Sequence, residues 1–195
     1  MATIIEDGTG AGYALAINSR GRLLAAATIE ERAVFNSAND GQTYMILTDY
    51  LTVTGVTSQE DGILYIKNTS DLKMYIHHIK VGCGTSGQFT KIKLYRNPTT
   101  GTLITSTIDA DITNMNYGSA NSFEGLAYQG DGTNLTVTNG SVMGRHYLGV
   151  GMQQSLMQMF MGSVVLEKGS SIAITAEAPN GVTVNITCEI MVYFE

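Results

Sequence analysis

The fold is decided by the last long segment of the chain, TVNITCEIMVYF, at residues 183–194. Every second side chain from Val184 to Phe194 is apolar, and most of the residues between them are polar or less apolar. A β-strand places alternate side chains on opposite faces of its sheet. The segment therefore predicts a long strand with one face on a hydrophobic core.

The same period of two recurs upstream of this segment. Further strands are predicted at YLTVTGV (50–56), GILYIKN (62–68), QFTKIKLYR (88–96) and SSIAITAE (170–177). Turn-forming residues separate them at 39–41, 60–62, 97–98, 130–132 and 179–181. Short strands at this spacing, without amphipathic crossover helices, predict an all-β fold, an antiparallel sandwich or barrel.

The predicted strand around His77 and His78 changes its phase at the histidine pair. Met74 and Ile76 share one face, whereas Ile79 and Val81 fall on the other. A slip of one residue would expose half of this apolar set, and a β-bulge at the histidines would restore it. The pair is thus interpreted as a bend, and a metal site is disfavoured because the only other histidine is His146.

A methionine-rich stretch, residues 153–165, fits a helix and a strand about equally well. Its methionines include Met157, Met159 and Met161, which are flexible, polarizable and suited to irregular apolar surfaces. Two interpretations stay open here. These side chains fill the core, or they line a contact between subunits.

The first forty residues differ from the rest and are interpreted as an N-terminal arm with a possible short hairpin, ahead of a sandwich domain at 41–195. The arm contains GTGAGYALAINSRGRLL (8–24). Gly8 and Gly10 match the first two glycines of a dinucleotide-binding fingerprint, but Tyr13 occupies the third glycine position. Its glycines suit an extended chain that follows another surface. The predicted contact residues of the arm are Gly8, Gly10, Gly12, Tyr13, Arg20 and Arg22.

Composition excludes several function classes as main roles. The net charge is −6, only 14% of residues are charged, and no basic cluster is present, which disfavours nucleic acid as a partner. No segment has the length of a membrane span or the pattern of a signal peptide, so we expect no membrane association. Cys83 and Cys188 are predicted to be buried free thiols.

Catalytic and cofactor motifs are weak throughout the sequence. It contains no GxSxG elbow and no cysteine-protease signature. The DADITN segment (109–114) lacks the glycine and the glutamate that a calcium loop needs. We therefore predict a protein without a cofactor and without enzymatic activity, and a hydrolase is the weakest alternative.

Four pieces of the chain carry a resemblance to virion structural proteins of tailed bacteriophages. They are GTGAGYALAINSRGRLLAAATIEERAVF (8–35), GILYIKNTSDLKMYIHHIKVGCGTSG (62–87), KLYRNPTTGTLI (93–104) and VLEKGSSIAITAEAPNGVTVNITCEIMVYFE (165–195). These motifs are turns and strands, so the resemblance transfers no catalytic residue. It implies a jelly-roll-like sandwich that decorates or cements a phage head.

The resemblance also implies partners and a location. The expected partners are the major capsid protein and further copies of this chain, as a homotrimer. The expected location is the virion, assembled in the cytoplasm of a bacterial host. The alternative function is a receptor- or glycan-binding module of a tail fibre or baseplate, because such modules are similar sandwiches.

Overall fold

The computed structural model describes residues 36–84, 89–132, 135–149 and 154–195. Within these ranges nearly all regular structure is β-strand, and a helical turn at 36–39 precedes the first strand. The elements are β1 (Thr43–Leu47), β2 (Leu51–Thr54), β3 (Asp61–Asn68), β4 (Met74–Cys83), β5 (Thr90–Arg96), η1 (Leu103–Thr105), β6 (Asp111–Asn114), β7 (Gly125–Gln129), β8 (Ser141–Leu148), β9 (Gln154–Leu166), β10 (Ser171–Glu177) and β11 (Thr183–Phe194).

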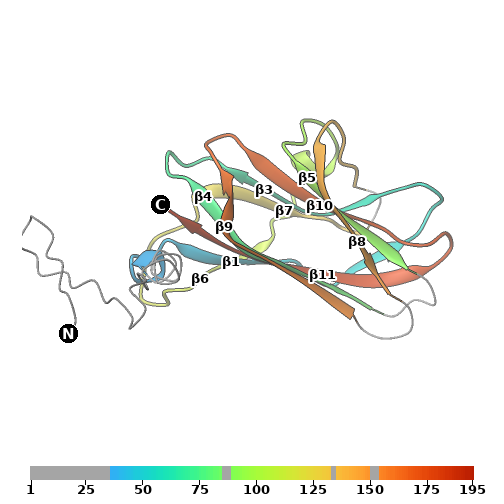
Figure 1. Cartoon of the computed structure of the whole chain (residues 1–195), viewed down its shortest axis with the longest axis horizontal. Coiled ribbons are helices and arrows are strands. Elements are labelled where there is room, and N and C mark those ends of the chain that lie inside the picture. The colour runs from blue at the N-terminus through green and yellow to red at the C-terminus, as the bar shows by residue number, and fades with distance from the viewer. Residues whose placement is uncertain (1–35, 85–88, 133–134, 150–153) are drawn as a thin grey trace, which may run out of the picture.

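The strands form two antiparallel sheets that pack face to face (Figure 1). Sheet 1 has the order β6-β1-β11-β4-β9, and β2 pairs with the part of β11 that lies beyond β1. Sheet 2 has the order β7-β3-β10-β5-β8. The predicted all-β antiparallel sandwich is confirmed.

The path of the chain through the two sheets is that of a jelly roll. Starting from β1 and β2 in sheet 1, it crosses to β3, returns to β4 and crosses again to β5. After an insertion it continues in sheet 2 as β8, and then alternates through β9, β10 and β11. Eight strands wound in this way make the double Greek key of a jelly roll.

The core lies between the inner faces of the two sheets. The alternate apolar side chains of β11, from Val184 to Phe194, are all buried, as the sequence predicts. Opposite them lie the isoleucines of β3, β5 and β10. Each such side chain, when it leaves water, contributes roughly 1.5–3 kcal/mol to stability. At one end of the core, Phe194 packs edge-on against Tyr44, with ring centroids 5.9 Å apart.

The bulge predicted at the histidine pair is present. In the β4–β11 ladder, Ile76 opposes Val192 and His78 opposes Met191, so His77 is the extra residue. Ile76 before the bulge and Ile79 after it are both buried, because the added residue reverses the phase of the strand.

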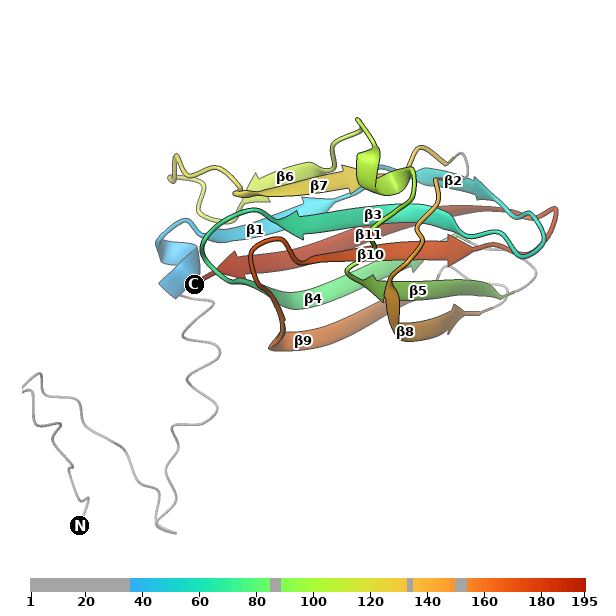
Figure 2. The same cartoon turned by 90° about the horizontal axis from the view of Figure 1, so that it is seen from above.

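An insertion between β5 and β8 closes one flank of the sandwich. It adds β6 to sheet 1 beside β1, and β7 to sheet 2 beside β3. The backbone NH of Ala110 donates to the carbonyl of Ala127 at 3.0 Å, which joins the two added segments. Figure 2 shows β6 and β7 together at this flank and β8 and β9 at the opposite one.

The structure corrects one predicted turn and decides between helix and strand for the methionine-rich stretch. The 60–62 turn is wrong in part, because β3 already begins at Asp61 and Gly62 lies inside it. This glycine serves close approach, since a Cβ atom there would lie 2.7 Å from the Leu103 side chain. Within the ambiguous stretch at 153–165, the described residues 154–165 are strand, because β9 hydrogen-bonds to β4 along sheet 1.

The boundary between an arm at 1–40 and a domain at 41–195 stays a prediction, because the described residues begin only at 36. The helical turn at 36–39 packs on the sandwich, where the Ser37 hydroxyl donates to the carbonyl of Phe194 at 3.3 Å. The arm residues Gly8, Gly10, Gly12, Arg20 and Arg22, together with Tyr13, lie outside the described residues.

Candidate functional site

The flank formed by β8 and β9 is an edge of the sandwich with exposed apolar side chains. Within the described ranges, β8 is paired only with β5, and β9 only with β4. The segment Gln154–Leu166 contains no charged residue and no proline. Natural edge strands are usually short, charged or covered, because a free edge is a template for pairing with another chain.

Apolar side chains on both edge strands face outward at this flank. They are Val142 and Met143 on β8 and Met159 and Val165 on β9, all exposed. A hollow of about 310 Å³ lies between the strands and is lined by Met143, Val165 and neighbouring residues. We call these four side chains and this hollow the β8–β9 flank.

The predicted methionine contact residues all lie in β9. Met159 is about half exposed, whereas its neighbour Phe160 turns inward and packs against the core. The core interpretation therefore holds for Phe160 and not for Met159. The side chains of Met157 and Met161 are not among those that the structure describes.

Sheet pairing extends the methionine surface beyond the stretch that the sequence singled out. Across sheet 1, Met45 on β1 opposes Met191 on β11. Met191 opposes His78, and His78 opposes Met159. Three methionines distant in sequence thus share one row on the outer face of the sheet, and only the register reveals this.

The two bulge histidines interact with each other at this row. Their Nδ1 atoms are 3.0 Å apart, and Nε2 of His78 lies 3.5 Å from the Glu189 carboxylate. Burial, reinforced by the nearby His78, lowers the pKa of His77 below its ordinary value. Among the described residues, no group of three or more His, Cys, Asp or Glu side chains is placed to hold a metal ion.

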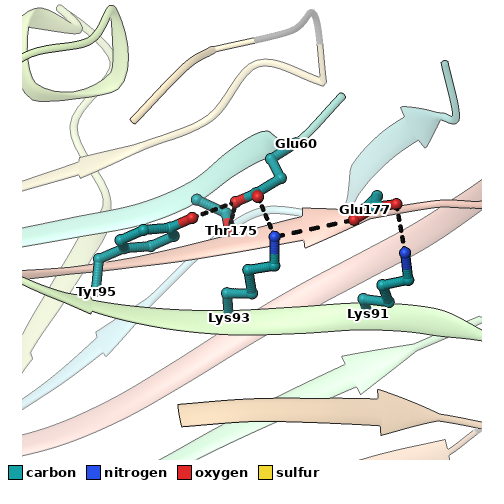
Figure 3. Close-up of polar contacts among 6 residues, drawn as sticks. All are labelled: Glu60, Lys91, Lys93, Tyr95, Thr175 and Glu177. Atoms are coloured by element: carbon teal, nitrogen blue, oxygen red, sulfur yellow. Dashed lines mark hydrogen bonds and ion pairs between the residues drawn. The ribbon is translucent and has the colours of Figure 1, made fainter. Parts of the chain in front are cut away.

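A second candidate surface lies on the outer face of sheet 2, where a line of polar side chains runs along β5 and β10 (Figure 3). Lys93 and Tyr95 of β5 both bond to Glu60, which precedes β3, and the Tyr95 hydroxyl donates to Glu60 Oε2 at 2.8 Å. Thr175 of β10 donates to the same oxygen at 2.9 Å.

The hydrogen bonds around Glu60 keep its carboxyl group ionised. Burial by itself would raise the pKa of Glu60, but the hydrogen bonds from Lys93, Tyr95 and Thr175 outweigh it and hold that pKa below its ordinary value. Burial, together with the bond to Glu60, raises the pKa of Tyr95 to about 12. At neutral pH the site therefore holds a carboxylate that accepts from two neutral hydroxyls and one ammonium.

The polar line ends at a pocket of about 610 Å³ between the β2–β3 and β10–β11 connections. Lys91 and Glu177 lie on its floor, with Nζ of Lys91 2.6 Å from Oε1 of Glu177. Tyr147 and Phe89 lie beside them and are exposed. Sequence reasoning missed this pocket, and the only local signal was the alternation that places Lys91 and Lys93 on the outward face of β5.

Comparisons with known proteins find distant likenesses among solved structures. No family model and no curated protein matches the chain. Among solved structures, it is similar to "Structure of infectious bursal disease virus Gx strain", with a TM-score of 0.36 and 10% sequence identity. The alignment covers 77% of this chain and 31% of that chain, so the chain spans less than a third of its length. The jelly-roll assignment rests on the strand order and register given above.

Within the described residues, no helix is long and apolar enough to cross a bilayer.

Proposed function

We propose that this protein is a structural component of a tailed-bacteriophage virion that decorates or cements the head by binding across subunits of the major capsid protein. The resemblance of its turns and strands to such proteins suggests this role. The observation that carries the assembly part of this proposal is the β8–β9 flank, whose edge strand β9 has thirteen residues, no charge and, within the described ranges, no pairing partner besides β4.

The occupant that we propose for this flank is a second copy of the chain, in a homotrimer. The opposite flank is closed by β6 and β7, so the two flanks present different surfaces to a neighbouring subunit. An apolar edge with a hollow beside it gains both backbone pairing and buried area when another copy covers it.

Binding to the shell is assigned to the N-terminal arm. The described chain begins at residue 36, at the side of the sandwich where Ser37 meets Phe194, and thirty-five residues precede it. A cement protein stabilises its target by mass action, by RT ln(1 + [L]/Kd) for each site.

The role is tested by imaging purified particles and counting copies. Hundreds of copies over the shell, and a capsid that melts at a higher temperature when the protein is bound, would support it. A few copies at the tail would overturn it. A chain that lacks residues 1–35 should fold and fail to bind the particle, and binding at full affinity would refute the assignment to the arm.

The trimer is tested by sedimentation of matched variants. Val165 on β9 and Leu126 on β7 are both 38% exposed, but they lie at opposite flanks. We expect Val165→Asp to sediment as a monomer and Leu126→Asp to sediment as the wild type does. A monomeric wild type, or an unchanged trimer in Val165→Asp, would contradict the proposed interface.

A further inference from the structure

The pocket between the β2–β3 and β10–β11 connections has the form of a small-molecule site. Its volume of about 610 Å³ lies within the range usual for such sites. Three strands of sheet 2 (β5, β8 and β10), the β2–β3 and β10–β11 connections, and Phe89 just before β5 contribute to it. Its lining consists of Val56, Thr57, Ser58, Phe89, Lys91, Tyr147, Glu177, Ala178, Pro179 and Asn180.

The walls of the pocket are held in place by backbone contacts. The NH of Gly55 donates to the carbonyl of Val182 at 2.8 Å, and the NH of Gly181 donates to the carbonyl of Gly55 at 2.9 Å. A Cβ atom on Gly55 would lie 2.0 Å from the Pro179 carbonyl oxygen, so only glycine permits this approach. The two connections therefore form a preorganised wall, which lowers the entropic cost of binding.

The pocket presents aromatic surface to solvent. Tyr147 is 63% exposed and Phe89 is 59% exposed. Tyr147 opposes Lys91 across the β5–β8 ladder, and Lys91 opposes Glu177 across the β5–β10 ladder. One row thus places an aromatic ring, an ammonium and a carboxylate side by side on the outer face of sheet 2.

The charges of that row cancel. Lys91 and Glu177 form a close ion pair, and the next pair along the line is Lys93 with Glu60. The pocket therefore has no net charge with which to attract an anion or a cation. Its ammonium, amide and hydroxyl groups donate hydrogen bonds, its carboxylate accepts them, and its two aromatic side chains offer apolar contact.

We propose that this pocket binds the terminal sugars of an uncharged glycan. A sugar has hydroxyl groups that donate and accept and CH faces that pack on aromatic rings, and the row of Tyr147, Lys91 and Glu177 matches both properties. This inference does not depend on the virion role, because the pocket belongs to the described sandwich and lies on strands and connections other than β9 and the arm.

The first test is an array of uncharged and acidic bacterial polysaccharides, probed with the full-length protein. Isothermal titration with the uncharged oligosaccharide that binds best then measures the effect of substitutions. Tyr147→Ala and Phe89→Ala should each weaken binding at least about 10-fold, which corresponds to about 1.4 kcal/mol. Tyr117→Ala is the matched control, because Tyr117 is an exposed tyrosine in the β6–β7 connection and does not line the pocket.

Each outcome decides the proposal. Binding of uncharged glycans that is lost in Tyr147→Ala and kept in Tyr117→Ala supports it. Absence of glycan binding, binding of acidic polysaccharides alone, or equal losses in both tyrosine variants overturns it. Sugar binding is read on the isolated protein, so its failure would leave the proposed capsid role standing, and the reverse also holds.

Discussion

The ion pair and hydrogen bonds around Glu60 predict a specific dependence of stability on pH. Replacing this residue by glutamine keeps its shape but removes the charge and leaves Lys93 with only Glu177, whose carboxylate is 4.0 Å away. In the wild type, Glu60 accepts bonds from Lys93, Tyr95 and Thr175.

The magnitude follows from the contacts and their exposure. A hydrogen bond to a charged group contributes about 1.5–3 kcal/mol. The amide oxygen of glutamine can still accept from both hydroxyls, because Tyr95 and Thr175 donate to a single oxygen, so the loss is mainly that of the Lys93 bond. The side chains of Lys93 and Glu60 are 20% and 23% exposed, so solvent screens part of this interaction. We therefore expect Glu60→Gln to lower the free energy of unfolding by about 2 kcal/mol at pH 7, or to lower Tm by about 4–8 °C.

The sign of the pH dependence follows from the lowered pKa of Glu60. A carboxyl group with a lowered pKa in the folded state stabilises the fold above its unfolded pKa, here 4.5, and loses that contribution as the pH falls through the folded value. The difference between wild type and Glu60→Gln should thus be full at pH 7. It should shrink below pH 4.5 and vanish once Glu60 is protonated in the folded protein.

The assay is unfolding in guanidinium chloride and by heat over a pH series. Glu167→Gln is the matched control, because Glu167 pairs with Lys73 at 3.3 Å but the two side chains are 65% and 53% exposed. An exposed pair of this kind contributes about 0–1 kcal/mol. The reasoning is refuted if both variants lose the same stability at pH 7, or if the loss in Glu60→Gln persists after the carboxyl group is protonated.

Three further predictions concern the core and the bulge. Deleting His77 should lower the free energy of unfolding, measured by chemical denaturation, by at least about 3 kcal/mol, because the buried side chains of one half of β4 would move to the solvent face. His77→Ala keeps the extra residue and should lower it by about 1 kcal/mol or less. Ile190→Ala should lower the free energy of unfolding by about 2–5 kcal/mol, since this side chain is fully buried. Burial raises the pKa of both Cys83 and Cys188, so a thiol reagent should label them at the rate of unfolding, and fast labelling of the folded protein would contradict their burial.

Much of the fold could be predicted from the two-residue period of apolar side chains and from the turn-forming residues between strands. The alternation in 183–194 identified both the strand and its inward face, and the phase change at the histidine pair located the bulge. Both depend on the side-chain period of two, which is a local property of the backbone. The predicted turn at 60–62 was wrong because Gly62 is needed for close packing against Leu103, which is far away in the sequence.

The candidate surfaces were much less predictable. Met159 was singled out as a member of a cluster in sequence, but its companions on the sheet, Met45 and Met191, come from strands far away in the chain. The pocket required Tyr147, Lys91 and Glu177 to meet across two ladders. Composition indicated neither set.

The sequence by itself determined that this chain is an all-β fold of antiparallel strands, which residues of its strands face the core, and where one strand bulges. Tertiary structure decided the jelly-roll strand order, the closing of one flank by β6 and β7, and the openness of the other at β8 and β9. The physical reason is the range of the interactions. The face of a strand on which a side chain lies is determined by the local backbone, which alternates from one residue to the next. Which strand edge stays free depends on how all the other strands pair.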